Sequence, residues 1–103
     1  MSDMDSPDFQ ALVQELQLHR NQIQTVSTQI NEISLTLESL STQDADRPIF
    51  RAVGNLLLEV DDRKKLMKEL SESKETFESH LERMIERETE LRTQYEKVID
   101  SME

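Results

Sequence analysis

Cysteine and tryptophan are absent from this 103-residue chain, which has one glycine, two prolines and only 4% aromatic residues. Without cysteine there is no disulfide framework, no thiolate nucleophile and no thiolate zinc or iron–sulfur site. With so few bulky side chains, an ordinary globular core is not expected, although the chain's strong periodicity argues against disorder. Charged residues make up 33% of the sequence. This composition favours one structural unit built from long helices, and we expect no cofactor or metal.

A positive net charge is also missing, because the formal net charge is −10. Phosphate binding requires groups of Lys and Arg, so nucleic acid is not an expected partner. No apolar run approaches the length of a membrane span, and residues 1–5 are acidic, unlike a signal or transit peptide. We therefore expect a cytoplasmic protein without membrane contact.

The first half of the chain predicts a helix over residues 7–42. Ser6 is a good N-cap, Pro7 suits the first helical position, and Asp8 lies near the positive end of the helix dipole. Apolar residues then recur at alternating spacings of three and four, which is typical of a coiled-coil seam. The positions in this seam are Phe9, Leu12, Leu16, His19, Ile23, Val26, Ile30, Ile33, Leu37 and Leu40. Only His19 is polar.

The last part of the chain predicts a second helix over residues 61–103, opened by Asp61 and Asp62 as N-cap and first-turn acids. Its seam has the same spacing, and two of its positions are charged, Lys74 and Glu88. The seam positions are Met67, Leu70, Lys74, Phe77, Leu81, Met84, Glu88, Leu91, Tyr95, Val98 and Met102. Two seams of similar length predict an antiparallel pair, in which Phe9 meets the region of Met102 and Leu40 the region of Leu70.

Between the helices, residues 48–60 predict a β-hairpin. Two short aliphatic runs flank Gly54-Asn55, a pair that suits a two-residue turn. This turn would pair Val53 with Leu56, and continuing the register would place Ile49 opposite Val60. Both faces of the hairpin are then partly apolar. A lone hairpin is marginal in water and its edges can pair with another chain, so we interpret it as an element of assembly.

The predicted fold class is therefore mainly α: a long antiparallel two-helix coiled coil with one β-hairpin at the bend. Catalytic function is not expected, because no Ser/His/Asp constellation, phosphate-binding loop or zinc spacing is present. His19, at a seam position, more often sets register than performs chemistry, and it would face Glu88 or Leu91. His80 is expected to be a solvated histidine.

The segment from Phe50 to Val60, running into a charged helix, resembles the hairpin of beta-class prefoldin subunits. In that family an aromatic residue precedes a Val-Gly pair and a short aliphatic strand follows, as Phe50, Val53-Gly54 and 56–58 do here. The alpha class has two hairpins and a longer linker, whereas one hairpin fits this chain. The spacing is similar to that of archaeal beta subunits and of eukaryotic subunit 2.

This resemblance implies one prefoldin-like domain over residues 1–103 that works as an ATP-independent chaperone subunit. It implies a hetero-hexamer of two alpha-class and four beta-class subunits, whose hairpins join in an inter-subunit β-barrel. The far ends of the arms would bind non-native proteins and deliver them to a group II chaperonin. The expected assembly residues are Ile49, Phe50, Val53, Gly54, Leu56, Leu57, Leu58 and Val60.

Apolar residues cluster near both ends of the chain, which an antiparallel pair brings together at the arm tips. Helix ends fray, so such residues can be uncovered without unfolding the arm. The expected client-binding residues are Phe9, Leu12, Val13, Leu16, Tyr95, Val98, Ile99 and Met102. Alternatively, these residues only complete the seam, and the chain is a structural or tethering scaffold without clients. A simple antiparallel homodimer adaptor is a third reading.

Overall fold

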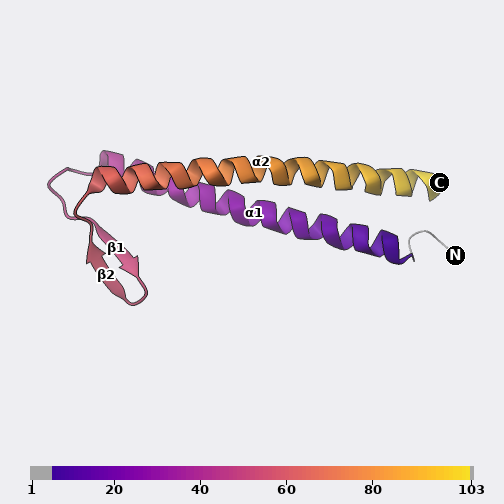
Figure 1. Ribbon diagram of the computed structural model, residues 1–103, viewed down its shortest axis with the longest axis horizontal. Coiled ribbons are helices and arrows are strands. Elements are labelled where there is room, and N and C mark those ends of the chain that lie inside the picture. Colours follow the sequence, from indigo (N-terminus) through magenta and orange to yellow (C-terminus); the bar gives the residue numbers. More distant parts are fainter. Residues whose placement is uncertain (1–5, 103) are drawn as a thin grey trace.

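Two long antiparallel helices joined by a β-hairpin make up the chain (Figure 1). The computed structural model describes residues 6–102. In chain order the elements are α1 (Pro7–Thr42), β1 (Phe50–Val53), β2 (Leu56–Glu59) and α2 (Arg63–Met102). The molecule measures 69 × 25 × 16 Å. The hairpin projects from the end where α1 stops and α2 starts, and the opposite end holds the beginning of α1 and the end of α2. The predicted fold class is confirmed.

Helix α1 begins as its sequence predicts. The Ser6 hydroxyl accepts a hydrogen bond from the backbone N–H of Phe9 at 3.1 Å, with Pro7 in the first turn and Asp8 beside it. At the other end, the backbone N–H of Gln43 donates to the carbonyl of Ser39 at 3.1 Å. The helix then gives way to an extended residue and a short turn before Pro48, a residue that disfavours helix immediately before it.

Helix α2 begins two residues later than the predicted start at residue 61. The Asp62 carboxylate accepts a hydrogen bond from the backbone N–H of Lys65 at 3.0 Å, which is the bond of an N-cap residue. A capping residue has non-helical backbone, so Asp61 and Asp62 precede the helix and its first turn contains no acid. The expectation of first-turn acids was therefore wrong. The predicted last residue, 103, lies outside the described residues.

The interface between the helices follows the predicted seams. Every seam position in both helices is buried or half-buried, including Lys74 and Glu88. The most buried side chains are Leu16, Leu40, Met84 and Leu91, and Leu91 is only 1% exposed. Because one stripe on each helix supplies nearly all the apolar contact, the arm has a thin core and a largely solvated surface.

The predicted pairing of the two seams needs correction. Phe9 stacks on Tyr95, seven residues before Met102, and the Arg63 side chain reaches the carbonyl of Leu40, seven residues before Leu70. A seam that repeats every heptad defines which faces meet but not their offset along the helix axis. The offset depends on the length of the connection between the helices and on individual side-chain contacts. The periodicity of the seam carries no information about either.

The hairpin has the predicted register. Phe50 pairs with Glu59, Arg51 with Leu58, Ala52 with Leu57 and Val53 with Leu56. One step beyond the strands, the backbone N–H of Val60 donates to the carbonyl of Ile49 at 2.8 Å. Side chains alternate between the two faces of a strand, so Arg51, Val53, Leu56 and Leu58 share one face. Phe50, Ala52, Leu57 and Glu59 share the other.

Candidate functional site

The hairpin presents an apolar surface that nothing in the described chain covers. Its five large apolar strand residues are each at least 50% exposed. They are Phe50, Val53, Leu56, Leu57 and Leu58. Ile49 and Val60, at the base of the hairpin, are half-buried. Contiguous apolar surface of this kind marks an interaction site, and here it occupies both faces of the sheet.

The strand edges of the hairpin are also open. The sheet has two strands, β1 and β2, so within residues 6–102 each strand has one edge without a backbone partner. Unpaired N–H and C=O groups along such an edge form a template for a further strand. Apolar faces and open edges together make the hairpin suitable for joining a larger sheet.

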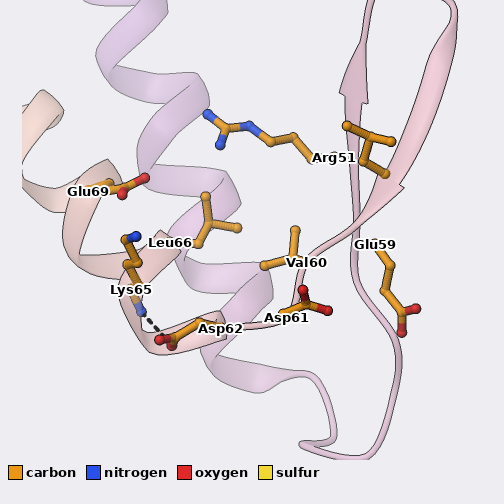
Figure 2. Close-up of a pocket in the computed structure, with 9 residues that line it drawn as sticks. Arg51, Glu59, Val60, Asp61, Asp62, Lys65, Leu66 and Glu69 are labelled. Carbon is orange, nitrogen blue, oxygen red and sulfur yellow. Dashed lines mark hydrogen bonds between the residues drawn. The ribbon is translucent and has the colours of Figure 1, made fainter.

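One face of the hairpin looks across a groove toward the start of α2 (Figure 2). Arg51 extends from the strand over this groove, and Val60 and Leu66 line its floor, while Glu59 points away on the far side. The remaining lining residues are Leu58, Asp61, Asp62, Lys65 and Glu69. The hairpin thus stands away from the arm, which leaves its apolar faces open to a partner.

Gly54 makes the tight turn of the hairpin possible. Its φ is +58°, and no non-glycine residue within the described chain has a positive φ, so Asn55 does not share this conformation. A positive φ at the first central residue alone is the pattern of a type II′ turn, which matches the twist of the two strands. An added Cβ would meet nothing within 4 Å, so backbone conformation and not space requires glycine here.

The arm tips bring residues from both ends of the chain together. The rings of Phe9 and Tyr95 stack with centroids 5.7 Å apart and planes inclined by 24°. A shallow groove beside them is lined by Phe9, Leu12 and Val98, together with Ser6, Asp8, Gln94 and Ser101. The tip thus combines an aromatic pair with a partly apolar recess at the end of the arm.

The eight residues predicted to bind clients differ in accessibility. Seven are half-buried: Phe9, Leu12, Val13, Tyr95, Val98, Ile99 and Met102. Leu16 is only 5% exposed, so a client would reach it only if the helices separated. Of the eight, Phe9, Leu12 and Val98 line the tip groove, and Tyr95 lies beside it through its stacking on Phe9. The structure therefore gathers Phe9, Leu12, Tyr95 and Val98 most closely.

Ion pairs join the two helices next to the buried Leu16–Leu91 part of the seam. Arg87 contacts Glu15 across the interface at 2.9 Å and Glu90 on its own helix at 3.1 Å, and Arg20 contacts Glu88 at 3.2 Å. The hydrogen bond from Arg87 to Glu15, followed by that to Glu90, raises the pKa of the guanidinium above its ordinary value. Arginine is charged at physiological pH in any case, so these contacts mark Arg87 as the centre of an ion-pair group and do not change its charge. These partly exposed pairs help to define the offset between the helices.

Sequence reasoning missed some of these residues. It noted Glu88 as a charged seam position but did not find its partner Arg20, and it did not single out the Glu15–Arg87 pair. The ring Nδ1 of His19 lies 3.0 Å from the carbonyl oxygen of Glu15 in the same helix, so this contact of the histidine stays within α1. The signal that could have found these ion pairs is the position of their residues in the heptad, because charged residues beside a seam commonly pair across it. Arg63, which contacts the connection between α1 and β1, was missed as well.

No group of three or more His, Cys, Asp or Glu side chains in residues 6–102 is arranged to hold a metal ion. Over the same range, neither helix is sufficiently long and apolar to cross a bilayer.

Comparison with known proteins places these features in a family. The family model described as prefoldin subunit matches residues 6–103. The chain is 33% identical over 96 residues to prefoldin subunit beta of Archaeoglobus fulgidus, covering 86% of this chain and 82% of that protein. It is 32% identical over 89 residues to prefoldin subunit beta of Thermoplasma volcanium, covering 82% and 72% of the two chains.

Solved structures show the same fold. The crystal structure of the prefoldin beta2 subunit from Thermococcus strain KS-1 superposes with a TM-score of 0.73 at 23% identity, covering 84% of this chain and 92% of that one. The prefoldin beta subunit from the same strain gives a TM-score of 0.55 at 23% identity, covering 99% and 94%. Both comparisons support the arrangement of two helices around one hairpin.

Proposed function

Because this chain belongs to the prefoldin family of chaperone subunits, we propose that it is a beta-class subunit that holds non-native proteins without ATP. In this proposal residues 1–103 act as one unit with two working ends. The hairpin joins the chain to other subunits, and the arm tips contact clients. We further propose that it works in the cytoplasm and delivers its clients to a group II chaperonin, a proposal supported by the family membership.

The assembly part of the proposal is supported by the exposed apolar hairpin. Each of its five large apolar residues is at least half exposed, although the arm is otherwise largely polar on its surface. Burying such side chains contributes roughly 1.5–3 kcal/mol each, which is ample to hold subunits together when several are buried. Prefoldin beta subunits are part of a multi-subunit complex. We propose two alpha-class and four beta-class subunits joined through a β-barrel of hairpins.

The observation that carries the chaperone proposal is the cluster of half-buried apolar residues at the free end of the arm. Phe9, Leu12 and Val98 line a recess that lies at the opposite end of the molecule from the hairpin. Assembly would therefore leave this recess accessible. A few apolar contacts per arm give weak and reversible binding, and several arms acting together raise the overall affinity.

The proposal predicts aggregation suppression by the assembled complex. The chain is mixed with an alpha-class partner, and a chemically denatured protein is diluted into the complex without nucleotide while light scattering is recorded. We expect scattering to fall as the complex approaches equimolar amounts, and adding ATP should change nothing. An assembled complex that leaves scattering unchanged would instead favour a structural scaffold without clients.

A further inference from the structure

The side chain of Arg63 makes an unusual set of contacts at the base of the hairpin. Its Nη1 donates to the carbonyls of Leu40 at 3.4 Å and Gln43 at 3.1 Å. Its Nη2 donates to the carbonyls of Asp44 at 3.1 Å and Arg47 at 3.0 Å. One half-buried guanidinium thus contacts four backbone carbonyls across eight residues. Hydrogen bonds from a charged donor are stronger than those between neutral groups.

The position of Arg63 is unfavourable for its own helix. Arg63 is the first residue of α2 and is followed by Lys64 and Lys65, although cations are destabilising near the positive N-terminus of a helix. The last turn of α1 lacks a basic residue that could interact with its terminal carbonyls. Arg63 provides that interaction from the other helix through the carbonyl of Leu40. A cation that is unfavourable for its own helix in this way is expected to stabilise contacts with another part of the chain.

The contacts of Arg63 close a ring at the base of the hairpin. The backbone N–H of Arg47 donates to the carbonyl of Asp44 at 3.1 Å, and Arg63 binds the carbonyls at both ends of this turn. Only Pro48 separates Arg47 from Ile49, which accepts the hydrogen bond from Val60. Segments 47–49 and 60–63 are thus joined at one end by the Ile49–Val60 bond and at the other by Arg63.

The ring limits how the hairpin can move relative to the arm. On the β2 side the hairpin is attached covalently through Asp61 and Asp62. On the β1 side the guanidinium of Arg63 donates to the carbonyl of Arg47, and the ring of the following residue, Pro48, fixes that residue's own φ angle. Without these hydrogen bonds, the connection from residue 43 to residue 48 would be a polar loop with few restraints, and the hairpin would hinge on the β2 side alone.

We propose that Arg63 is a positioning residue for assembly, which fixes the direction of the hairpin relative to the arm before partner subunits bind. This inference rests on the proposed function of the hairpin in assembly. A pre-ordered hairpin loses less conformational freedom on association, so the subunits bind more tightly. Lysine cannot replace Arg63 fully, because its ammonium lacks the planar fork of donors that reaches several carbonyls at once.

The test measures hairpin order and assembly in the same variants. The chain has no cysteine, so Asn55→Cys and Lys68→Cys place spin labels at the turn of the hairpin and on the exposed surface of α2. Labelled chain is diluted into unlabelled chain, and double electron–electron resonance gives the distribution of distances between the labels before any partner is added. An alpha-class partner is then titrated in, and the extent of assembly is measured for each variant. The variants are Arg63→Gln, Arg63→Lys and the control Arg83→Gln, whose exposed side chain has no hydrogen bond or ion pair within residues 6–102.

We expect Arg63→Gln to widen the distance distribution and to weaken assembly about tenfold, with Arg63→Lys between Gln and the original residue. Helicity by circular dichroism should stay unchanged in all three variants, as should the distribution and assembly of Arg83→Gln. A distribution as narrow as in the unsubstituted chain, or a wider one with unchanged assembly, would overturn the inference about Arg63. In both cases the proposed function would stand, provided that aspartate at Val53 and Leu57 still disrupts the complex.

Discussion

Replacing Val53 and Leu57 together with aspartate is expected to break the assembled complex into individual arms. The two residues lie on opposite faces of the hairpin, and each is at least 50% exposed in the single chain. Each replacement removes roughly 1.5–3 kcal/mol of apolar burial from the interface and adds a carboxylate whose desolvation costs several kcal/mol more. Together these effects should weaken assembly by about a thousandfold or more.

The arm itself should survive this change, because neither residue contributes to the seam between the helices. Helicity measured by circular dichroism and the thermal unfolding midpoint of the isolated chain are expected to stay near those of the original. Leu35→Asp is the control for adding a carboxylate at an exposed leucine, since Leu35 is 63% exposed and belongs to α1, outside the hairpin. Size-exclusion chromatography with light scattering gives the mass of each variant. A particle of unchanged mass from the double variant would contradict the assembly role.

Removing the arm tips is expected to abolish aggregation suppression while assembly persists. Deleting residues 1–16 removes Phe9 and Leu12, and deleting residues 95–103 removes Tyr95 and Val98. Of the deleted segments, residues 1–5 and 103 lie outside the described residues. Each lost side chain forfeits roughly 1.5–3 kcal/mol of client contact. Since several arms hold one client, the losses multiply, and suppression should fall by more than about tenfold.

Point variants separate tip chemistry from arm length. Phe9→Ser combined with Val98→Ser keeps the arm intact and should reduce suppression nearly as much as truncation. Leu18→Ser is the control, because Leu18 is 54% exposed on the arm but does not line the tip groove. Light scattering of a denatured protein diluted into each complex provides the measurement. Equal protection by full-length and truncated complexes would show that the client-binding surface lies elsewhere.

Much of the fold follows from local patterns in the sequence. The alternation of three and four residues predicted which side chains would be buried between the helices, and each of those positions is at least half-buried. The Ser6-Pro7 start and the Gly54-Asn55 turn were equally readable, because a cap and a tight turn depend on a few neighbouring residues. Local chemistry determines these features almost completely.

Contacts between distant residues were not predictable in the same way. The offset that stacks Phe9 on Tyr95 is invisible in a repeating seam, and the four carbonyl contacts of Arg63 depend on the path of the linker. The start of α2 was predicted too early because the same acids suit an N-cap and a first turn. The candidate hairpin and tip residues were identified from their apolar character, whereas their accessibility in a complex depends on chains beyond this one.

The measurement that tests the account most directly is the native mass of the unmodified chain with and without an alpha-class partner. The account predicts that the mixture forms one particle with four copies of this chain and two of the partner, held together at the hairpins. A mixture in which this chain stays a small elongated monomer or dimer and leaves the partner unbound would contradict it.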